Sequence, residues 1–426
     1  MKNFDRIAIG IIIAMMVMKT SLTKIFAKFI PIFNLSYDPP ILSILYVLMI
    51  MAAILLVCVP RMITGKRDVS LRSLWDGYSF LIAELVILAH AIIMTDIVTI
   101  ANGQLRISNV LTHNLDYMYA FLALPITILL VEKKWKFEDF ADVLLAISFA
   151  SMLLRLFVVI INGATGIEIE CISRESTFEG WIRNGRIRIV PPCFIMLCEP
   201  VCIYMFNQVK EVGKKLWYLL VLGMTIFYAY FVWQSRMAIL FIMGGIVVML
   251  LFKQMSKKSA YIRWGIVGAG AVLLIIAGGA IKLISMFSTN ENAKYIGENR
   301  GHYYAYDVFW GQIKMSPIFG TGLTEQMAMK SNYIGMQWLC DAGIMYSIVP
   351  MGIMIVLFFF LMFSRGIYVY IKGYSSSKLA VVALALATVF MGFELSADCF
   401  FTPLAFVVPF YLAIVEYSNS QAMADE

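Results

Sequence analysis

Apolar stretches of about 18 or more residues recur along this chain with almost no charge, and they restrict its fold more than any other feature. A helix needs roughly 20 such residues to cross the hydrocarbon core of a bilayer. Of the 426 residues, 61% are hydrophobic and 14% are charged. A soluble domain of this length cannot keep so much apolar surface away from water. The sequence therefore predicts an all-α polytopic membrane protein that forms one integral membrane domain over residues 1–426.

We expect about twelve transmembrane helices, because that many apolar stretches are long enough to span. They cover residues 5–19, 41–59, 77–100, 115–131, 139–162, 191–208, 215–233, 237–252, 263–284, 336–363, 379–397 and 402–417. The first stretch, Ile7–Met18, has the length of a signal-peptide core. Lysines follow it without a small-residue cleavage pattern, so we interpret it as an anchor.

The connecting loops alternate in charge. Short loops rich in lysine and arginine follow the second, fourth, sixth, eighth and tenth spans, and with the two termini they hold more than half of the 34 Lys and Arg residues. Short positively charged loops face the cytoplasm. We therefore expect both termini to be cytoplasmic.

Two long connections are expected on the external face, at residues 163–190 and 285–335. Loops of such length are usually functional or disordered, and the second, between spans nine and ten, is too aromatic for disorder. It contains Tyr303, Tyr306 and Trp310 at helical spacing, which predicts a short amphipathic helix at the membrane interface. Pro317 ends this helix, and glycines permit a tight turn after it. A simple lid or anchor is the alternative interpretation.

Arginines gather in the segments expected outside. Arg300 opens the amphipathic helix, and Arg236 lies in "QSRMAIL" between spans seven and eight, where a charge is costly unless it is functional or snorkels to the interface. The loop before span six adds Arg174, Arg183, Arg186 and Arg188. A guanidinium binds phosphate through a bidentate fork, so we predict an external anion site. A solvated basic face, or pairing with the acids of the same loop, is the alternative.

A catalytic acid or base is harder to choose from the sequence. The external candidates are His302, Asp307, Glu325, Asp341, Glu394 and Asp398. Glu84 and Glu199 fall within spans, where each is either functional or hydrogen-bonded to a neighbouring helix. The seven cysteines are scattered and no metal-ligand cluster is evident, so we expect neither a metal nor a cofactor.

Several of these features together resemble the bacterial O-antigen ligase and Wzy polysaccharide polymerase superfamily. The resemblance covers spans seven to ten by motif and the remainder only by topology. The matching positions are Ser235–Arg236, Arg300, Trp310, Pro317, Gly320, Gly322, Ser331–Asn332 and Gly343–Ile344. The ligase branch carries a histidine where this chain has Ser331, and this departure favours the polymerase branch.

The resemblance implies a GT-C-like glycosyltransferase of the bacterial inner membrane that needs no metal and joins oligosaccharide units carried on undecaprenyl diphosphate. Arg236 and Arg300 would hold the diphosphate, with Arg186 and Arg188 as secondary candidates. The remaining implied roles are sugar or lipid contacts for Tyr303, Tyr304 and Trp310, hydroxyl orientation for Asn332, and a catalytic base at Glu325 or Asp307. Membrane lipids and a chain-length regulator are candidate partners, and no nucleic acid is expected.

Two alternative functions remain open from the sequence. One is an O-antigen-type ligase, which differs from a polymerase in its acceptor. The other is a lipid-linked oligosaccharide flippase or another transporter, which would need charged residues along a path through the bundle.

Overall fold

The computed structural model describes the chain in segments, and every structural statement below refers to these. They are residues 2–20, 39–63, 71–103, 114–165, 182–183, 186–187, 189, 191–233, 236–252, 309–323, 333–334, 337–338, 343–373, 377–394, 399–400 and 404–424. Within them the chain is helical apart from two short β hairpins.

The helices follow one another along the chain with short links. They are α1 (Lys2–Lys19), α3 (Pro39–Ile63), α4 (Leu71–Ala101), the 3₁₀ turn η3 (Tyr119–Leu122) with α6 (Ala123–Val131), α7 (Phe137–Thr165), α9 (Ile195–Gln208), α10 (Val212–Phe227) with the π-helical η4 (Tyr228–Trp233), α11 (Arg236–Leu251), α16 (Met345–Met351), α17 (Ile353–Gly373), α18 (Ala380–Glu394), and the 3₁₀ turn η7 (Ala405–Val407) with α19 (Val408–Ala424).

Each hairpin consists of two antiparallel strands of two residues. In the first, β1 (Ile182–Arg183) pairs with β2 (Arg186–Ile187), and the register places Arg183 opposite Arg186. In the second, β3 (Tyr333–Ile334) pairs with β4 (Gln337–Trp338).

Six of the described helical segments are long and apolar enough to cross a membrane. They are Ser43–Ile63, Tyr78–Ala101, Asn114–Val131, Phe137–Thr165, Val212–Trp233 and Ile353–Gly373. Shorter apolar helices at Ile239–Leu251 and Ala380–Glu394 pack among them. The prediction of an all-helical, multi-pass membrane protein is confirmed, whereas the count of twelve spans stays a prediction.

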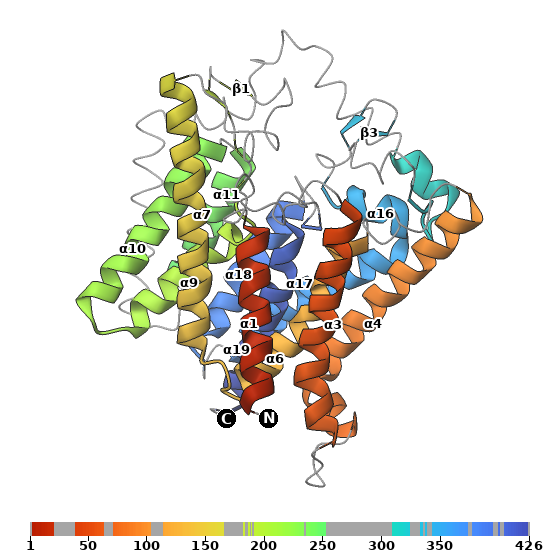
Figure 1. Ribbon diagram of the computed structural model, residues 1–426, viewed down its shortest axis with the longest axis horizontal. Coiled ribbons are helices and arrows are strands. Elements are labelled where there is room, and N and C mark those ends of the chain that lie inside the picture. The colour runs from red at the N-terminus through yellow and green to blue at the C-terminus, as the bar shows by residue number, and fades with distance from the viewer. Residues whose placement is uncertain are drawn as a thin grey trace.

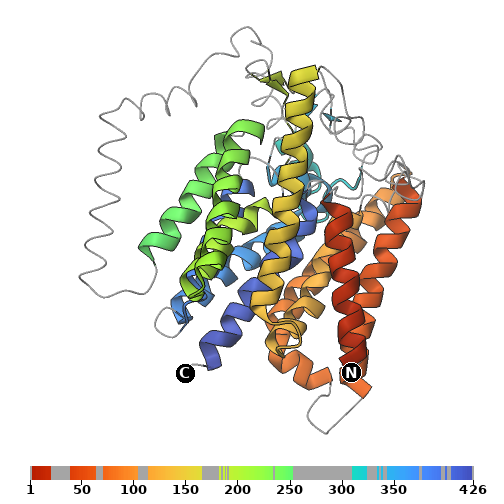
Figure 2. The same cartoon turned by 60° about the vertical axis from the view of Figure 1, so that its left-hand side comes forward.

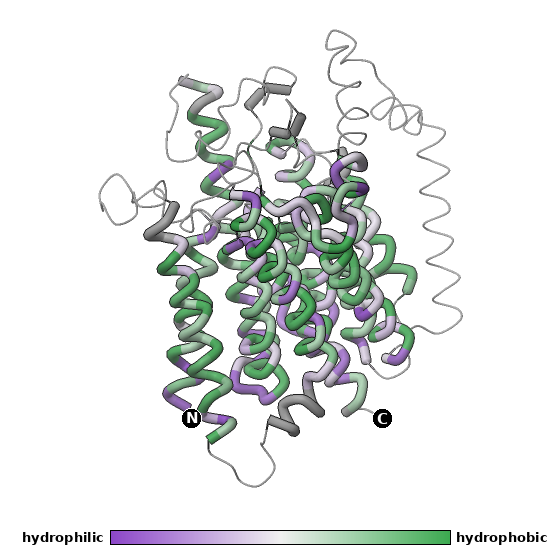
Figure 3. The backbone as a smooth tube through the Cα atoms, turned by 90° about the vertical axis from the view of Figure 1, so that its right-hand side faces the viewer, coloured by the Kyte–Doolittle hydropathy of each residue, from purple (hydrophilic) through white to green (hydrophobic). Residues whose placement is uncertain are grey.

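The helices form a bundle in which both termini lie at one end and both β hairpins lie at the other (Figures 1 and 2). We call these the terminal end and the hairpin end. Hydrophobic residues run along the lengths of the helices between them (Figure 3). The links between α6 and α7 and between α9 and α10 reach the terminal end, and they carry Lys133, Lys134, Lys136 and Lys210. This distribution agrees with the predicted orientation, in which the terminal end is cytoplasmic.

The predicted tenth span, 336–363, differs most from the observed helices. Residues 337–338 form β4 instead, and the helix is interrupted between α16 and α17. The interruption has a local cause, because Pro350 cannot continue the backbone hydrogen bonding and Gly352 adopts a φ of +68°. The helix then runs on to Gly373, into a stretch predicted to be a loop. The predicted ninth span, 263–284, lies outside the described residues.

Helix α18 is the buried centre of the bundle, and almost every one of its residues is inaccessible to solvent. Close approach to its neighbours depends on small residues. Gly392 lies against the ring of Phe241 in α11, and Gly366 of α17 lies against Ala387 of α18. A side chain at either glycine would collide with the opposing helix, so these positions set the interhelical distances.

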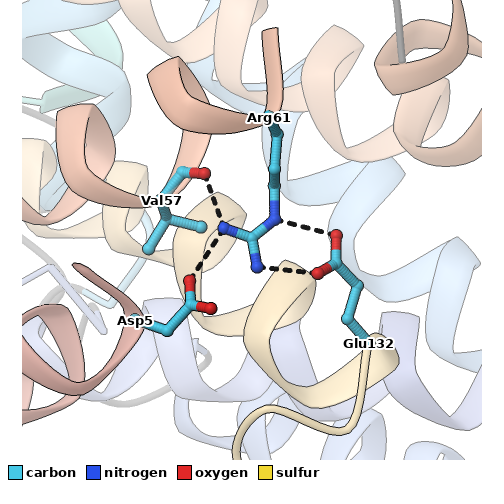
Figure 4. Close-up of polar contacts among 4 residues, drawn as sticks. All are labelled: Asp5, Val57, Arg61 and Glu132. Carbon is cyan, nitrogen blue, oxygen red and sulfur yellow. Dashed lines mark hydrogen bonds and ion pairs between the residues drawn. The ribbon is translucent and has the colours of Figure 1, made fainter. Parts of the chain in front are cut away.

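A buried guanidinium joins three helices near the terminal end (Figure 4). Arg61 of α3 donates to Asp5 of α1 over 2.9 Å and to both carboxylate oxygens of Glu132, after α6, over 2.8 and 2.7 Å. It also donates to the backbone oxygen of Val57 over 2.7 Å. Arg61 and Asp5 are almost fully buried, while the Glu132 side chain is 34% exposed. The junction therefore depends mainly on the pair with Asp5.

Replacement of Arg61 by methionine should destabilise the bundle, because Asp5 would keep a buried charge without its partner. Loss of one member of a buried ion pair costs about 3–5 kcal/mol. Thermal unfolding of the purified protein in lipid nanodiscs measures the effect, with Lys136→Met in the exposed link as the control. The double variant Asp5→Asn with Arg61→Met should recover part of the loss, and equal stability of the Arg61 variant and the wild type would contradict the interpretation.

Candidate basic site at the hairpin end

The segment before α9 connects the first β hairpin to the body of the bundle. Its described residues, Ile189 and 191–194, are buried. The backbone N–H of Ile189 donates to the oxygen of Val232 in η4 over 3.4 Å, and the Tyr228 hydroxyl of η4 donates to the oxygen of Ile189 over 3.4 Å. The chain of Arg186 and Arg188 is therefore attached to the helical turn that leads directly to Arg236.

Two cations from other helices lie close to the same segment. Arg155 of α7 and Lys19 at the end of α1 both interact electrostatically with the thiol of Cys193. Arg155 is 1% exposed and heads the largest fully buried side chains of the described residues. A buried ionisable group within a membrane bundle is costly to keep and usually functional. We call Lys19, Arg155 and the segment formed by Ile189 and 191–194 the basic site.

Aromatic rings hold Lys19 in place. Its Nζ lies 4.7 Å from the centre of the Tyr46 ring and 4.5 Å from that of Tyr119. The two rings meet edge to face with centres 5.9 Å apart. Such cation–π contacts fix an ammonium group where water is scarce. Asp116 is buried nearby and interacts with the Tyr119 hydroxyl, so an acid is also present at this end of the bundle.

The structure brings together the chain positions of some predicted arginines and leaves others undetermined. Arg236 is the first residue of α11, and Arg186 belongs to β2, so their backbones lie on either side of the contact between Ile189 and Val232. The predicted side chains that fall outside the described residues are Arg188, Arg300, Tyr303, Tyr304, Asp307, Glu325 and Asn332, as are His302, Asp341 and Asp398.

Trp310 belongs to the helical residues 309–315 and is 52% exposed. Lys314 lies one turn further on, with its Nζ 6.0 Å from the centre of the Trp310 ring. Phe309 is buried on the opposite side. The described part of this segment is thus amphipathic, as the sequence predicts.

The three acids that the sequence places in or next to spans have different surroundings. Glu394 accepts a hydrogen bond from the backbone N–H of Cys399 over 2.8 Å, and its own backbone oxygen accepts one from Ile344 over 2.9 Å. It therefore fastens α18 to the segments around it. Glu84 and Glu199 are buried, and neither carboxylate has a hydrogen-bond partner among the described residues.

The motif "SPIFGTGL" has a structural role that the sequence only partly reveals. Its glycines, Gly320 and Gly322, adopt φ values of +71° and +73°, which confirms the predicted turn. The turn also binds the interruption between α16 and α17. Thr321 and Gly322 donate to the backbone oxygens of Val349 and Pro350 over 2.9 and 3.2 Å.

The contact between the motif and the helix interruption is reciprocal, because Ile353 at the start of α17 donates to the oxygen of Pro317 over 3.0 Å. Helix α4 adds the hydroxyl of Thr99, which accepts from the backbone of Leu323 over 2.8 Å. The motif therefore satisfies backbone groups that the broken helix leaves open. We call these contacts the motif clamp.

Metal binding finds no support in the part of the chain that the structure describes. No group of three or more His, Cys, Asp or Glu side chains in it is arranged to hold an ion. The described cysteines, Cys58, Cys193, Cys198, Cys202 and Cys399, are free thiols and buried.

Sequence reasoning missed Lys19 as a member of the basic site and treated Arg155 only as an intramembrane exception. The signal for Arg155 was present, since an arginine deep within an apolar stretch is rare. Lys19 gave no such signal, because a lysine after a span is ordinary. Its two tyrosine partners come from distant helices.

No protein-family model matches the sequence, and no curated protein matches it. The fold and composition define a multi-pass helical membrane protein. A more particular assignment depends on the arrangement at the hairpin end.

The motif clamp predicts that Gly320→Ala is destabilising whereas Gly311→Ala is not. A Cβ at Gly320 would collide with the backbone of Pro350 and would require a left-handed φ, whereas Gly311 has open space around it. Strain and overlap together should cost about 2–4 kcal/mol. Thermal unfolding in nanodiscs measures both variants, and equal melting temperatures would show that the clamp does not hold in the membrane.

Two buried glutamates should respond differently to replacement by glutamine. Glu416 of α19 accepts two hydrogen bonds from Arg365 of α17, over 2.6 and 2.9 Å, so its loss strands a largely buried guanidinium. We expect a cost of about 3 kcal/mol for Glu416→Gln. Glu199→Gln removes no described partner and should change stability by less than about 1 kcal/mol. Chemical denaturation of both variants compares them, and a larger loss for Glu199→Gln would be contradictory.

Proposed function

We propose that this protein is a bacterial cell-surface polysaccharide polymerase, a glycosyltransferase that joins oligosaccharide units carried on undecaprenyl diphosphate. The hairpin end would be the external face of the bacterial inner membrane, with both termini in the cytoplasm. The particular polymer is a capsule, exopolysaccharide or O-antigen of the source cell. The likeness in the motifs around Arg236 and Arg300 supports this proposal, and it rests on short sequence patterns.

The single observation that carries the proposal is the common neighbourhood of basic positions from distant parts of the chain. The segment before α9 follows Arg186 and Arg188, contacts η4 just before Arg236, and lies beside Arg155 and Lys19. The orientation rule requires no such cations at this end. A lipid-linked diphosphate at the membrane surface is an anion that would make use of them.

The chemistry suits such a site. A hydroxyl of the acceptor sugar attacks the anomeric carbon of the donor, the bond from that carbon to the diphosphate oxygen breaks, and the lipid diphosphate leaves with the electron pair. Negative charge grows on the leaving group during this step. Guanidinium groups fixed in advance stabilise that charge more in the transition state than in the ground state. A metal ion would then not be needed to neutralise it.

The proposed roles follow from the sequence and add two residues from the structure. Arg236 and Arg300 hold the diphosphate, Arg186 and Arg188 assist, and the hydroxyl proton passes to Glu325 or Asp307. The aromatic residues Tyr303, Tyr304 and Trp310 contact sugar or lipid, and Asn332 orients a hydroxyl. Lys19 and Arg155 of the basic site supply further positive potential from within the bundle.

Reconstitution tests the proposal directly. Purified protein in detergent, supplied with lipid-linked repeat units from the source cell, should extend them into long chains that a gel resolves by size. A detergent solution has no second compartment, so a flippase or other transporter would produce no extension. Transfer onto lipid A-core oligosaccharide in place of a second repeat unit would instead indicate an O-antigen-type ligase.

Variants of the arginines should separate their roles in this assay. Arg236→Ala, Arg300→Ala and Arg155→Gln should each lower the rate by roughly 10²–10³-fold, in the range found when one charge-stabilising donor is removed from an active site. Arg236→Lys should also be poor because the fork geometry is lost. The control is Lys134→Ala, in an exposed link at the terminal end. Unchanged chain length and rate in folded Arg236 and Arg300 variants would refute the proposal.

A further inference from the structure

Residues 309–319 present large apolar side chains to the outside of the bundle at the hairpin end. Trp310, Met315, Ile318 and Phe319 are 52%, 84%, 53% and 42% exposed. Lys314 is exposed among them, beside the Trp310 ring. In Figure 1 this segment (teal) lies near the end of α4 that is remote from the termini. We call these five residues the platform.

The platform cannot move independently of the spans, because the motif clamp begins within the same segment. The hydrogen bond from Ile353 to the oxygen of Pro317 holds Ile318 next to the start of α17. Gly352 lies directly against the backbone of Ile318. On the other side of the turn, Asn102 after α4 donates to the oxygen of Thr321 over 3.4 Å. The height of the platform along the bundle is therefore that of the ends of two membrane-spanning helices.

The platform continues two rows of lipid-facing residues. Helix α4 exposes Ile93, Ile97 and Ile100, which share one face, and α17 exposes Ile353, Leu357 and Phe360 in the same way. These rows belong to helices that cross the membrane, so their exposed side chains contact acyl chains. The platform begins where both rows end, since Pro317 is bonded to Ile353 and Leu323 is bonded to Thr99.

We propose that the platform is a lipid-binding surface, whose partner is the interfacial layer of the bilayer leaflet at the hairpin end. Trp310 lies at headgroup depth, where an amphipathic ring is most stable, and Ile318 and Phe319 enter the edge of the acyl region. Lys314 reaches the phosphate groups of the lipids with its ammonium while its stem packs on apolar surface. The identity of the substrate plays no part in this inference.

This surface also braces the interrupted helix. Lipid on one side and α4 on the other hold residues 317–322 in the position from which they bond Val349 and Pro350. The apolar side chains and the backbone hydrogen bonds belong to the same few residues. Insertion of the platform into the leaflet and closure of the helix interruption are consequently parts of one arrangement.

Fluorescence quenching in lipid nanodiscs tests the proposal with the full-length protein. A small fluorescent amino acid is introduced at position 318, and the nanodiscs contain phosphatidylcholine with brominated acyl chains. The same label at position 97, on the lipid-facing row of α4, is the membrane reference. The label at position 134, in an exposed link, is the aqueous reference. Iodide in the buffer serves as the aqueous quencher.

Strong quenching at position 318 by brominated lipid, close to that at position 97, with protection from iodide, is the expected result. Quenching by iodide instead would place the platform in water and overturn the proposal. Protection from both quenchers would also overturn it, because a second copy or another protein would then cover the surface.

A second measurement applies where the label perturbs the protein. Phe319→Glu should lower the melting temperature in nanodiscs by more than Lys134→Glu does, and Phe319→Leu should leave it unchanged. Equal melting temperatures for the two glutamate variants would contradict insertion of the platform into the leaflet.

Discussion

Inside a bilayer, a backbone N–H or C=O group that lacks a protein partner has no water to replace it, and this constraint shapes the region between Trp310 and Ile353. The span that ends in α17 is interrupted at Pro350 and Gly352, which opens several backbone groups. Residues 317–322 close them with reciprocal hydrogen bonds. The glycines of this motif are needed because two backbones must come within bonding distance, a requirement of structure rather than of chemistry.

Charged side chains obey a related constraint, and the two ends of the bundle meet it differently. Near the terminal end, Arg61 and Arg365 each have carboxylate partners that join helices distant in sequence. At the hairpin end, Lys19 is held by two tyrosine rings, and Arg155 lies beside the segment that carries further arginines. The first arrangement consumes its charge in structure. The second leaves positive potential next to a surface where a phosphorylated lipid would arrive.

Composition and hydropathy were enough to predict the fold class, because a helix that spans a membrane must be apolar over its whole length. They could not predict the interruption of the tenth stretch, since residues 336–363 are apolar whether or not the helix continues. The turn at Gly320 and Gly322 was predictable from residue type, but its attachment to Val349 and Pro350 was not. Such pairing depends on tertiary contacts that a one-dimensional pattern does not contain.

The candidate site shows the same division. Arginine in an external loop is visible in the sequence, whereas the contact between Ile189 and η4 joins residues that no local pattern relates. Lys19 was unremarkable as a flank of the first span, and only its position between Tyr46 and Tyr119 makes it notable. A sequence therefore identifies the types of group available, and the packing decides which of them meet.

The π-helical turn η4 has a consequence for how this region tolerates change in length. A π-type hydrogen bond encloses one residue more than an α-type bond, so η4 accommodates an additional residue within a continuous helix. Each residue turns an α-helix by about 100°. Deletion of one residue from 228–233 would restore regular winding and rotate the chain leaving Trp233 by that angle, without shortening the membrane crossing appreciably. The direction in which the polypeptide enters the Arg236 region is thus set by winding, and evolution can alter it in single steps.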